Sequence, residues 1–339
     1  MALKPPVEVP QGAIRLNTDS QKLEFFAQDQ WWQMATDVPT LDGGARGVIR
    51  GGQTPSSTNV IEYVTIPVAS NSTDFGDLTQ GDGGGDQPYG SRTRAIFTGG
   101  VPASNDAEYI TISSTGNSID FGNLTVSTYY SQGWSSQTRG LTVGGYPAPA
   151  ADTIGYCTIA STGDFVDFGD MLYDVSHGGS VGSPTRGVFG GGYSYPANPN
   201  GVENIQYLTI ATTGNTVDFG DMSTACHNIG GSGNSIRGVF ALGTAHPTVG
   251  LNVLEYITIA TTGNSADFGD STVSKTHKAG GCANSTRGLF QGAYVPGGGG
   301  ADNFIEYIAI PTTGNTVDFG DLTQSSFNAY GTSNAHGGL

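Results

Sequence analysis

The chain is patterned in short stretches in which apolar and polar residues alternate, and one such stretch recurs six times. Residues 305–310 place apolar side chains on one side of a strand, as alternation with a period of two predicts. After a short turn, residues 317–321 read as a neighbouring strand that carries the element Asp-Phe-Gly. This element recurs with steps of 46, 47, 51, 49 and 51 residues, at Asp74, Asp120, Asp167, Asp218, Asp267 and Asp318. A period near 50 residues predicts a repeat architecture.

Each repeat predicts four strands. The inner strand is a narrow Gly- and Ser-rich segment, and the second strand opens with arginine and usually ends in a glycine pair. The third strand has the Ile-Glu-Tyr pattern, and the outer strand carries Asp-Phe-Gly. Four short strands per repeat resemble the blade of a kelch-type β-propeller, a likeness of pattern over residues 45–339. The resemblance implies an all-β fold, a six-bladed β-propeller of four-stranded blades.

The two ends of the repeat region predict how the ring closes. The second strand at 46–49 has no inner strand ahead of it, whereas the unmatched segment 327–334 follows the last repeat. We expect this C-terminal segment to pair with the strand at 46–49. Pairing would close the ring and remove the exposed edges that an open array leaves.

The first 36 residues have a different pattern. Residues 1–12 read as an extended arm, and strands at 13–17, 22–26 and 31–34 predict a small β-meander. Residues 37–44 read as a linker to the repeats. A meander of this size buries too little surface to be stable alone, so we expect it to dock on a partner. The apolar candidates for anchoring are Ile14, Leu16, Phe25, Phe26, Trp31 and Trp32.

The meander resembles a short module of tailed-bacteriophage virion proteins. The matching residues are 12–19 (Gly-Ala-Ile-Arg-Leu-Asn-Thr-Asp), 22–24 (Lys-Leu-Glu) and the pair Trp31-Trp32, where the module usually has one tryptophan. The module occurs in fibre, collar and other appendage proteins. The resemblance implies assembly in the host cytoplasm and a final place in the virion. It also implies contacts with other virion proteins and with copies of the chain itself, a trimer being one option.

Composition narrows the partners. The net charge is −16 and only 12% of residues are charged, which disfavours nucleic acid and anionic membranes as partners. No run of 18 apolar residues predicts a membrane span, and the N-terminus lacks the apolar core of a signal peptide. The cysteines, Cys157, Cys226 and Cys282, have no CxxC spacing, so neither a disulfide framework nor a zinc site is expected.

The propeller prediction divides the connections between two faces. The turns from inner to second strand and from third to outer strand share one face, and because the third-to-outer turn is nearly constant this face is uniform. The other connections vary in length and carry aromatics and prolines, and they form a varied face. Because the N-terminal module joins the start of a second strand, we expect it on the uniform side, away from the varied face. The varied-face candidates for stacking on sugars, or for packing on the blades, are Tyr129, Tyr130, Trp134, Tyr146, Tyr193, Tyr195 and Tyr294.

Residues repeated in every copy are interpreted as structural, because an active site should break the symmetry. The repeated acids could alternatively hold Ca²⁺ or catalyse a reaction; they are Asp74, Asp77, Asp120, Asp167, Asp170, Asp218, Asp221, Asp267, Asp270, Asp318 and Asp321. The repeated arginines predict ion pairs within or between blades, or else a ring of anion sites; they are Arg46, Arg94, Arg139, Arg186, Arg237 and Arg287. His177, His227 and His277 occupy similar places and could converge on a metal, although local loop contacts are the commoner role. We therefore expect no metal, no cofactor and no catalytic residues.

These patterns favour a non-enzymatic virion protein, a tail fibre or appendage that attaches to a glycan or protein of the host surface. Two alternatives remain open. One is a capsid or neck decoration protein without a ligand. The other is a glycan-processing enzyme, which needs a carboxylate pair outside the repeat pattern.

Overall fold

The computed structural model describes residues 9–17, 22–33, 46–54, 56–147, 152–194, 200–247, 249–277, 280–295, 300–337 and 339. The chain divides into two compact parts, Met1–Gly43 and Gly44–Leu339, and each is described by itself. The described residues form strands and turns and contain no helix, so the all-β prediction is confirmed for them. None of the described elements is a helix that could cross a membrane.

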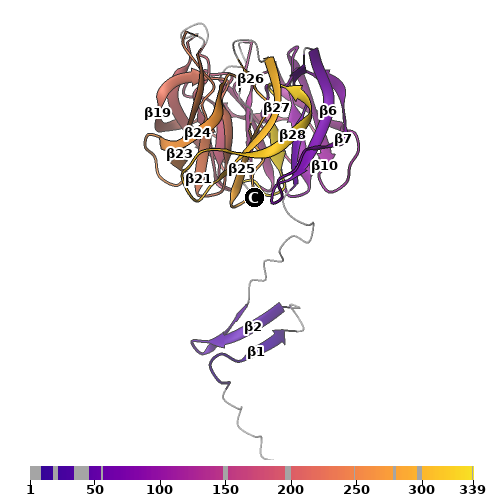
Figure 1. Cartoon of the computed structure of the whole chain (residues 1–339). Helices are drawn as coiled ribbons and strands as arrows, with labels where there is room; N and C mark the ends of the chain where they lie inside the picture. The colour runs from indigo at the N-terminus through magenta and orange to yellow at the C-terminus, as the bar shows by residue number, and fades with distance from the viewer. Residues whose placement is uncertain are drawn as a thin grey trace, which may run out of the picture. The chain divides into compact units, whose positions relative to one another are not determined.

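The N-terminal part contains a three-stranded antiparallel sheet whose strands follow chain order (Figure 1). The strands are β1 (Ile14–Asn17), β2 (Lys22–Ala27) and β3 (Gln30–Gln33). Ile14 lies opposite Phe25, and Phe25 lies opposite Trp32, so these three side chains share one face of the sheet. This register agrees with the predicted meander.

The main part consists of successive repeats of antiparallel strands, called repeats 1 to 6 (Figure 1). The second strands are β4 (Arg46–Arg50), β9 (Arg94–Thr98), β13 (Arg139–Val143), β17 (Arg186–Gly190), β21 (Arg237–Ala241) and β25 (Arg287–Gln291). The third strands are β6 (Ser56–Thr65), β10 (Ser104–Thr111), β14 (Thr153–Thr158), β18 (Val202–Thr209), β23 (Val249–Thr258) and β27 (Gly300–Ala309). The outer strands are β7 (Thr73–Asp82), β11 (Ile119–Thr128), β15 (Val166–Asp170), β19 (Val217–His227), β24 (Ala266–Lys275) and β28 (Val317–Ser326).

The inner strands are shorter and less uniform. They are β29 (Gly331–Ser333) in repeat 1, then β8 (Tyr89–Gly90), β12 (Gln132–Ser135), β16 (Gly179–Gly182) and β20 (Gly230–Gly233) in repeats 2 to 5. In repeat 6 the described residues show a single bridge, between Ala283 and Gly288, in place of a fourth strand. Three two-residue strands lie in the connections to the third strands: β5 (Gln53–Thr54), β22 (Thr244–Ala245) and β26 (Tyr294–Val295). Of these, β22 also pairs with β19 and so joins repeats 4 and 5 into one sheet.

The core lies between neighbouring repeats, because alternation gives each strand an apolar side that faces the next sheet. One hydrophobic cluster joins Val48 and Phe75 of repeat 1 to Phe97 and Ile110 of repeat 2. Corresponding clusters join repeats 2 and 3, 3 and 4, 4 and 5, and 5 and 6. A further cluster joins repeat 6 to repeat 1. A single sheet would leave this surface in water, so the repeats depend on one another for stability.

The outer-strand glycine allows the next repeat to approach closely. At Gly220 the backbone has φ +148°, and a Cβ there would lie 2.4 Å from the carbonyl oxygen of Gly263 in repeat 5. The amide of Gly263 donates to the carbonyl of Phe219 at 2.7 Å. The amide of Asp221 donates to Asn264 Oδ1 at 3.1 Å. The turn between the third and outer strands therefore fixes each repeat to the outer strand of the preceding repeat.

The same contacts continue from repeat 6 to repeat 1. The amide of Asp321 donates to Asn71 Oδ1 at 3.1 Å, and the amide of Ser72 donates to the carbonyl of Asp321 at 2.8 Å. In addition, β29 pairs with β4, with Thr332 opposite Val48. The predicted pairing of the C-terminal segment with the strand at 46–49 is thus observed.

The inner strands pack directly on one another at the centre. A Cβ at Gly231 would lie 2.1 Å from the carbonyl oxygen of Ser180, so the strands approach as closely as their backbones allow. The Gln87 side chain exchanges hydrogen bonds with the backbone of Ser180, at 3.1 and 3.2 Å. Near the C-terminus, buried His336 lies 3.1 Å from the carbonyl oxygen of Gly90.

Candidate functional site

The repeated arginines are structural, but the predicted ion pairs are wrong. Arg139 Nη1 donates to the carbonyl of Ile210 at 2.7 Å, and its guanidinium lies 4.5 Å from the ring centre of Tyr156. The same carbonyl bond is made by Arg46 to Ile112, Arg94 to Ile159, Arg186 to Ile259, Arg237 to Ile310 and Arg287 to Ile66. Each guanidinium also stacks on the tyrosine of its own third strand. Each arginine therefore joins two neighbouring repeats, and within the described part of the chain none of the six forms an ion pair with a carboxylate.

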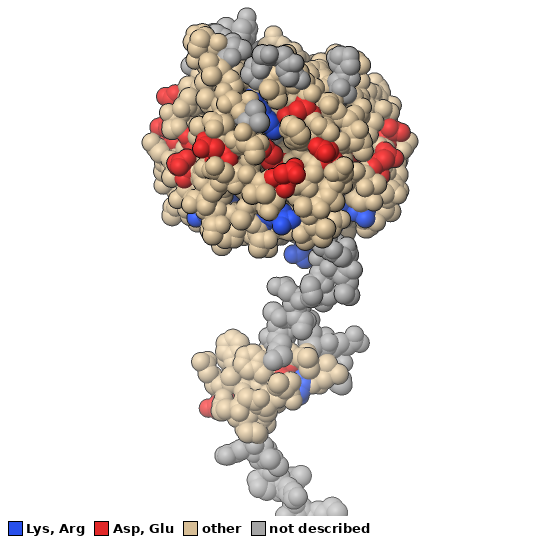
Figure 2. All heavy atoms as spheres, viewed as in Figure 1, with Lys and Arg blue, Asp and Glu red and all other residues tan. Residues whose placement is uncertain are grey.

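The Asp-Phe-Gly segments likewise belong to the framework. Phe219 is buried and meets Tyr207 edge-to-face at 5.9 Å, and the other repeats show the same ring pair. The acidic side chains of these segments are exposed or partly exposed, and acidic groups spread around the side of the main part in Figure 2. Among the described residues, no three His, Cys, Asp or Glu side chains are grouped to hold a metal ion.

Four of the predicted varied-face tyrosines do come together. Tyr129 meets Tyr130 at 4.9 Å and Tyr146 at 5.3 Å between ring centres. Two histidines extend the group: His177 lies 3.7 Å from Tyr130, and His227 stacks on Tyr193 at 3.7 Å. The His177 and Tyr193 rings lie 5.1 Å apart, which makes the group continuous. We call these six residues the aromatic strip: Tyr129, Tyr130, Tyr146, His177, Tyr193 and His227.

The strip is held by the outer-to-inner connections. Tyr130 and His177 adopt φ of +57° and +60°, in the left-handed region that few residues other than glycine occupy. The adjacent backbone is fixed by pairing, since Tyr129 bridges Tyr146 and Ser176 bridges Tyr193. Asn228, His277 and Asn328 adopt the same left-handed conformation after their own outer strands, so the backbone at this position belongs to the repeated framework that carries the strip side chains.

The other candidates lie elsewhere. The structure buries Trp134 in inner strand β12 with 5% exposure, where its Nε1 donates to the carbonyl of Ser183 at 3.3 Å. Its assignment to the varied face is wrong, because its indole fills space beside Gly182, which has no side chain. Tyr294 is 40% exposed in a separate group with His277 and Phe327. Tyr195 lies outside the described residues.

His177, His227 and His277 are electrically neutral at pH 7. Burial lowers the pKa of His177 well below its usual range, and the neighbouring His227 and His277 lower it further. Burial also lowers the pKa of His227 and of His277 to about 4. The strip therefore presents uncharged rings, which suit the C–H faces of a sugar better than an ion.

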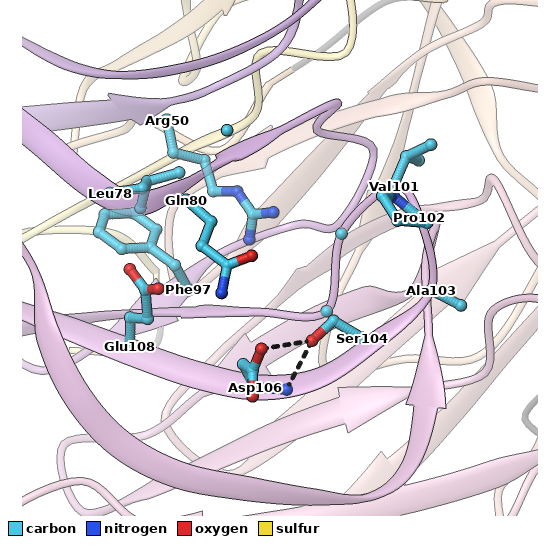
Figure 3. A pocket seen from close by; sticks show the side chains of 13 residues that line it. Arg50, Leu78, Gln80, Phe97, Val101, Pro102, Ala103, Ser104, Asp106 and Glu108 are labelled. Atoms are coloured by element: carbon cyan, nitrogen blue, oxygen red, sulfur yellow. Dashed lines mark hydrogen bonds between the residues drawn. The ribbon is translucent and has the colours of Figure 1, made fainter.

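A feature that sequence reasoning missed is a cavity of about 270 Å³ between repeats 1 and 2. Its inner wall holds the buried side chains of Arg50, Leu78 and Phe97, and its exposed rim includes Gln80 and Asp106 (Figure 3). It lies between the end of β7 and the β9–β10 connection, and so on the side of the sheets that carries the second-to-third connections. One signal was available: Arg50 ends a second strand at the position where the other repeats have Thr98, Val143, Gly190, Ala241 and Gln291.

The Arg50 guanidinium is fixed within the cavity wall. Its Nη1 donates to the carbonyl of Thr98 at 2.9 Å. Burial lowers the pKa of Arg50, and the charges of Asp86 and Glu108 oppose that shift. Burial raises the pKa of Asp86 to about 6, against the effect of the nearby guanidinium. Acidic groups therefore balance this buried cation.

Corresponding gaps between other repeats are nearly closed. Between repeats 5 and 6, Lys275 fills the gap, with Nζ 3.2 Å from Asp302 Oδ2 and 3.3 Å from Glu306 Oε2. The remaining space there is about 10 Å³. The gaps between repeats 6 and 1 and between repeats 2 and 3 hold about 10 and 20 Å³. Among these four gaps, only the one beside Arg50 is large, so this gap departs from the symmetry of the repeats.

The anchoring candidates divide between the two faces of the N-terminal sheet. Ile14, Leu16 and Trp32 are 61%, 60% and 44% exposed, and share one face with Phe25. Leu23, which the sequence reading did not select, lies opposite Leu16 on that face. The other face carries Phe26 and Trp31, whose rings meet at 5.3 Å, with the Arg15 guanidinium 4.1 Å from the Trp31 ring centre. We call the first group the apolar face: Ile14, Leu16, Leu23, Phe25 and Trp32.

No family model matches the chain, and no curated protein matches it at a significant level.

Proposed function

We propose that the chain is a structural protein of a tailed-bacteriophage virion, with a six-bladed β-propeller that attaches to a host-surface glycan. The propeller reading is supported by inter-repeat contacts that continue from repeat 6 back to repeat 1. The observation that carries the function is the contrast between a framework repeated around the main part and an aromatic strip at its varied end. Binding residues are often held in this way on loops of a rigid scaffold.

The apolar face of the N-terminal sheet supports the anchoring role. Exposed side chains such as Ile14, Leu16 and Trp32 cover one side of a sheet that is too small to provide a core. An exposed apolar patch on a separate part of a soluble chain favours a protein partner. We propose another virion protein as that partner, with a homo-oligomer of this chain assembled around it.

Attachment is favoured over hydrolysis by the state of the carboxylates in the cavity. Glu108 occupies a position shared with Glu62, Glu255 and Glu306, and it accepts hydrogen bonds from Thr79 and Ser118. Asp106 lacks an acidic counterpart at that position in the other repeats, and it accepts a hydrogen bond from Ser104 Oγ at 2.8 Å. One carboxylate engaged in the framework and one at the rim are not the acid and base that glycoside hydrolysis needs.

The attachment proposal is tested with envelope polysaccharide of the host bacterium immobilised on a column. We expect the purified protein to be retained without releasing oligosaccharide. The variant Tyr129→Ala/Tyr146→Ala should bind about tenfold more weakly, because two stacking rings are lost. The control Ile236→Ala removes an exposed apolar side chain from the uniform turn of repeat 5 and should bind as the unmodified protein does.

Three outcomes contradict the proposal. Released oligosaccharide would identify an enzyme. Incorporation into virions without any binding to host cells or polysaccharide would identify a decoration protein. A chain lacking residues 1–43 should remain folded and bind polysaccharide but be absent from virions, so its normal incorporation would refute the anchoring role.

A further inference from the structure

We propose that the cavity between repeats 1 and 2 binds one neutral pyranose ring. This inference rests on the proposed function only for the source of the sugar, which is the end of a host-surface glycan. The cavity differs from the aromatic strip in its residues and in its place among the repeats. It is therefore a second, separate contact for the same polymer.

The size of the cavity selects a single ring. Its volume of about 270 Å³ equals roughly nine waters at ~30 Å³ each. Pockets for drug-sized ligands begin near ~300 Å³, so an oligosaccharide would extend beyond the rim. A terminal or branching sugar fits this space while the rest of its chain lies over the varied face.

The charges around the cavity favour a neutral ligand. Arg50 is the buried cation, and the acidic groups that act on it are Asp86 and Glu108. Asp106 adds another carboxylate at the exposed rim. Positive charge is thus matched or exceeded, and a carboxylate or sulfate ligand would be repelled by Glu108 and Asp106, which line the cavity.

The polar side chains that line the cavity suit the hydroxyl groups of a sugar, because a hydroxyl both donates and accepts hydrogen bonds. In Figure 3 Arg50 and Gln80 both line one side of the hollow, and Asp106 with Ser104 lines another. The Gln80 amide can donate and accept, and the Asp106 carboxylate can accept. Leu78 and Phe97 supply an apolar surface for the C–H groups of the ring. Oriented polar groups beside an apolar wall are typical of small-molecule sites.

The broken symmetry indicates that the space is kept open. Lys275 closes the corresponding gap between repeats 5 and 6 with its own side chain and two carboxylates. In repeat 2, Ser104 stands where repeat 6 has Asp302, and Asp106 stands where it has Phe304. The polar groups of the cavity between repeats 1 and 2 can therefore bind a ligand, whereas in the gap between repeats 5 and 6 Lys275 is paired with two carboxylates.

The test measures saturation-transfer NMR and titration of the full chain with methyl glycosides of glucose, galactose, mannose and glucuronic acid. We expect at least one neutral glycoside to bind with a Kd on the order of 1 mM. Gln80→Ala and Asp106→Ala should each weaken it at least fivefold. Asn204→Ala, at the position of Asp106 in repeat 4, is the matched control and should leave binding unchanged. Both test side chains are exposed at the rim, so an unchanged melting temperature separates lost binding from lost folding.

The results separate the cavity from the attachment function. The inference is overturned if no neutral glycoside binds, if Asp106→Ala binds as well as the unmodified protein, or if the glucuronide binds more tightly than every neutral sugar. Retention on polysaccharide that depends on Tyr129 and Tyr146 would then still support the attachment function. Sugar binding lost in Asp106→Ala, without retention on any polysaccharide, would support the cavity and overturn attachment.

Discussion

At the scale of single residues, the outer-strand glycine shows how one repeat constrains the next. Gly220 has φ +148° and faces the carbonyl of Gly263, whereas Gly214 has φ +152° with no atom within 4 Å of an added Cβ. Both positions have a backbone that disfavours other residues, but a neighbouring repeat crowds only Gly220. The two glycines therefore separate the effect of conformation from the effect of close approach.

We expect Gly220→Ala to lower the free energy of unfolding by about 3 kcal/mol and Gly214→Ala by about 1 kcal/mol. The difference reflects the 2.4 Å contact that a Cβ at Gly220 would make with a backbone oxygen, which cannot move without displacing the turn. Urea unfolding of both variants measures it. Equal losses in the two variants would mean that the crowded contact relaxes at no cost.

Residue positions could be predicted from the repeat, but their partners could not. The recurrence of the six arginines predicts a structural role for them, but it does not identify their partners, and the expected carboxylates are wrong. The acceptor in each case is a backbone carbonyl of another repeat, such as Ile210 for Arg139, and a sequence does not mark such a group. Trp134 was misplaced for a related reason, since the space it fills depends on the absence of a side chain at Gly182, in the next repeat.

At the scale of elements, β29 is short but has an important place. Its three residues pair with β4, while flanking bonds join Arg50 to Tyr330 and Asn334 to Arg46. Without these residues the inner edge of β4 would be an unpaired edge. The pairing could be predicted because a segment was left over after the last repeat and a strand was missing before the first.

Removal of residues 327–339 should lower the melting temperature by 10 °C or more and promote association. The variant loses β29 and exposes the edge of β4, which can pair with another chain. Thermal unfolding and size-exclusion chromatography test both effects. A truncated protein that stays monomeric with an unchanged melting temperature would show that β29 contributes little.

At the scale of the whole molecule, acid should destabilise the fold. Burial lowers the pKa of His227, His277 and His336 to about 4, and it lowers the pKa of His177 well below its usual range. Unfolded histidine titrates near ~6.5, so between about pH 6.5 and 4 the unfolded chain binds more protons and stability falls as pH falls. Asp86 acts in the opposite sense below about pH 6, because its folded pKa is raised. Asp302 also acts in that sense, because burial raises its folded pKa. Four histidines oppose these two aspartates, so the net effect is a loss.

We expect the melting temperature to fall steadily from pH 7 to pH 4.5. His227→Phe keeps a ring against Tyr193 but removes one titrating group, so its melting temperature should fall less over that range. Ile236→Phe alters an exposed side chain that does not titrate and is the control, with an unchanged slope expected. If His227→Phe loses as much stability as the unmodified protein, His227 does not contribute to the pH dependence.

The pairing of β29 with β4 also has a consequence for the order in which the strands become available during synthesis. Arg46 and Ser333 are 287 positions apart, and ribosomes add about 5–20 residues per second, so β4 is made roughly 15–60 s before its partner. During that interval β4 is an open edge inside a crowded cell. A nascent neighbour that has already completed its own β29 could supply it first and produce an exchanged dimer. Faithful assembly therefore depends on each chain capturing its own last strand before it meets another copy.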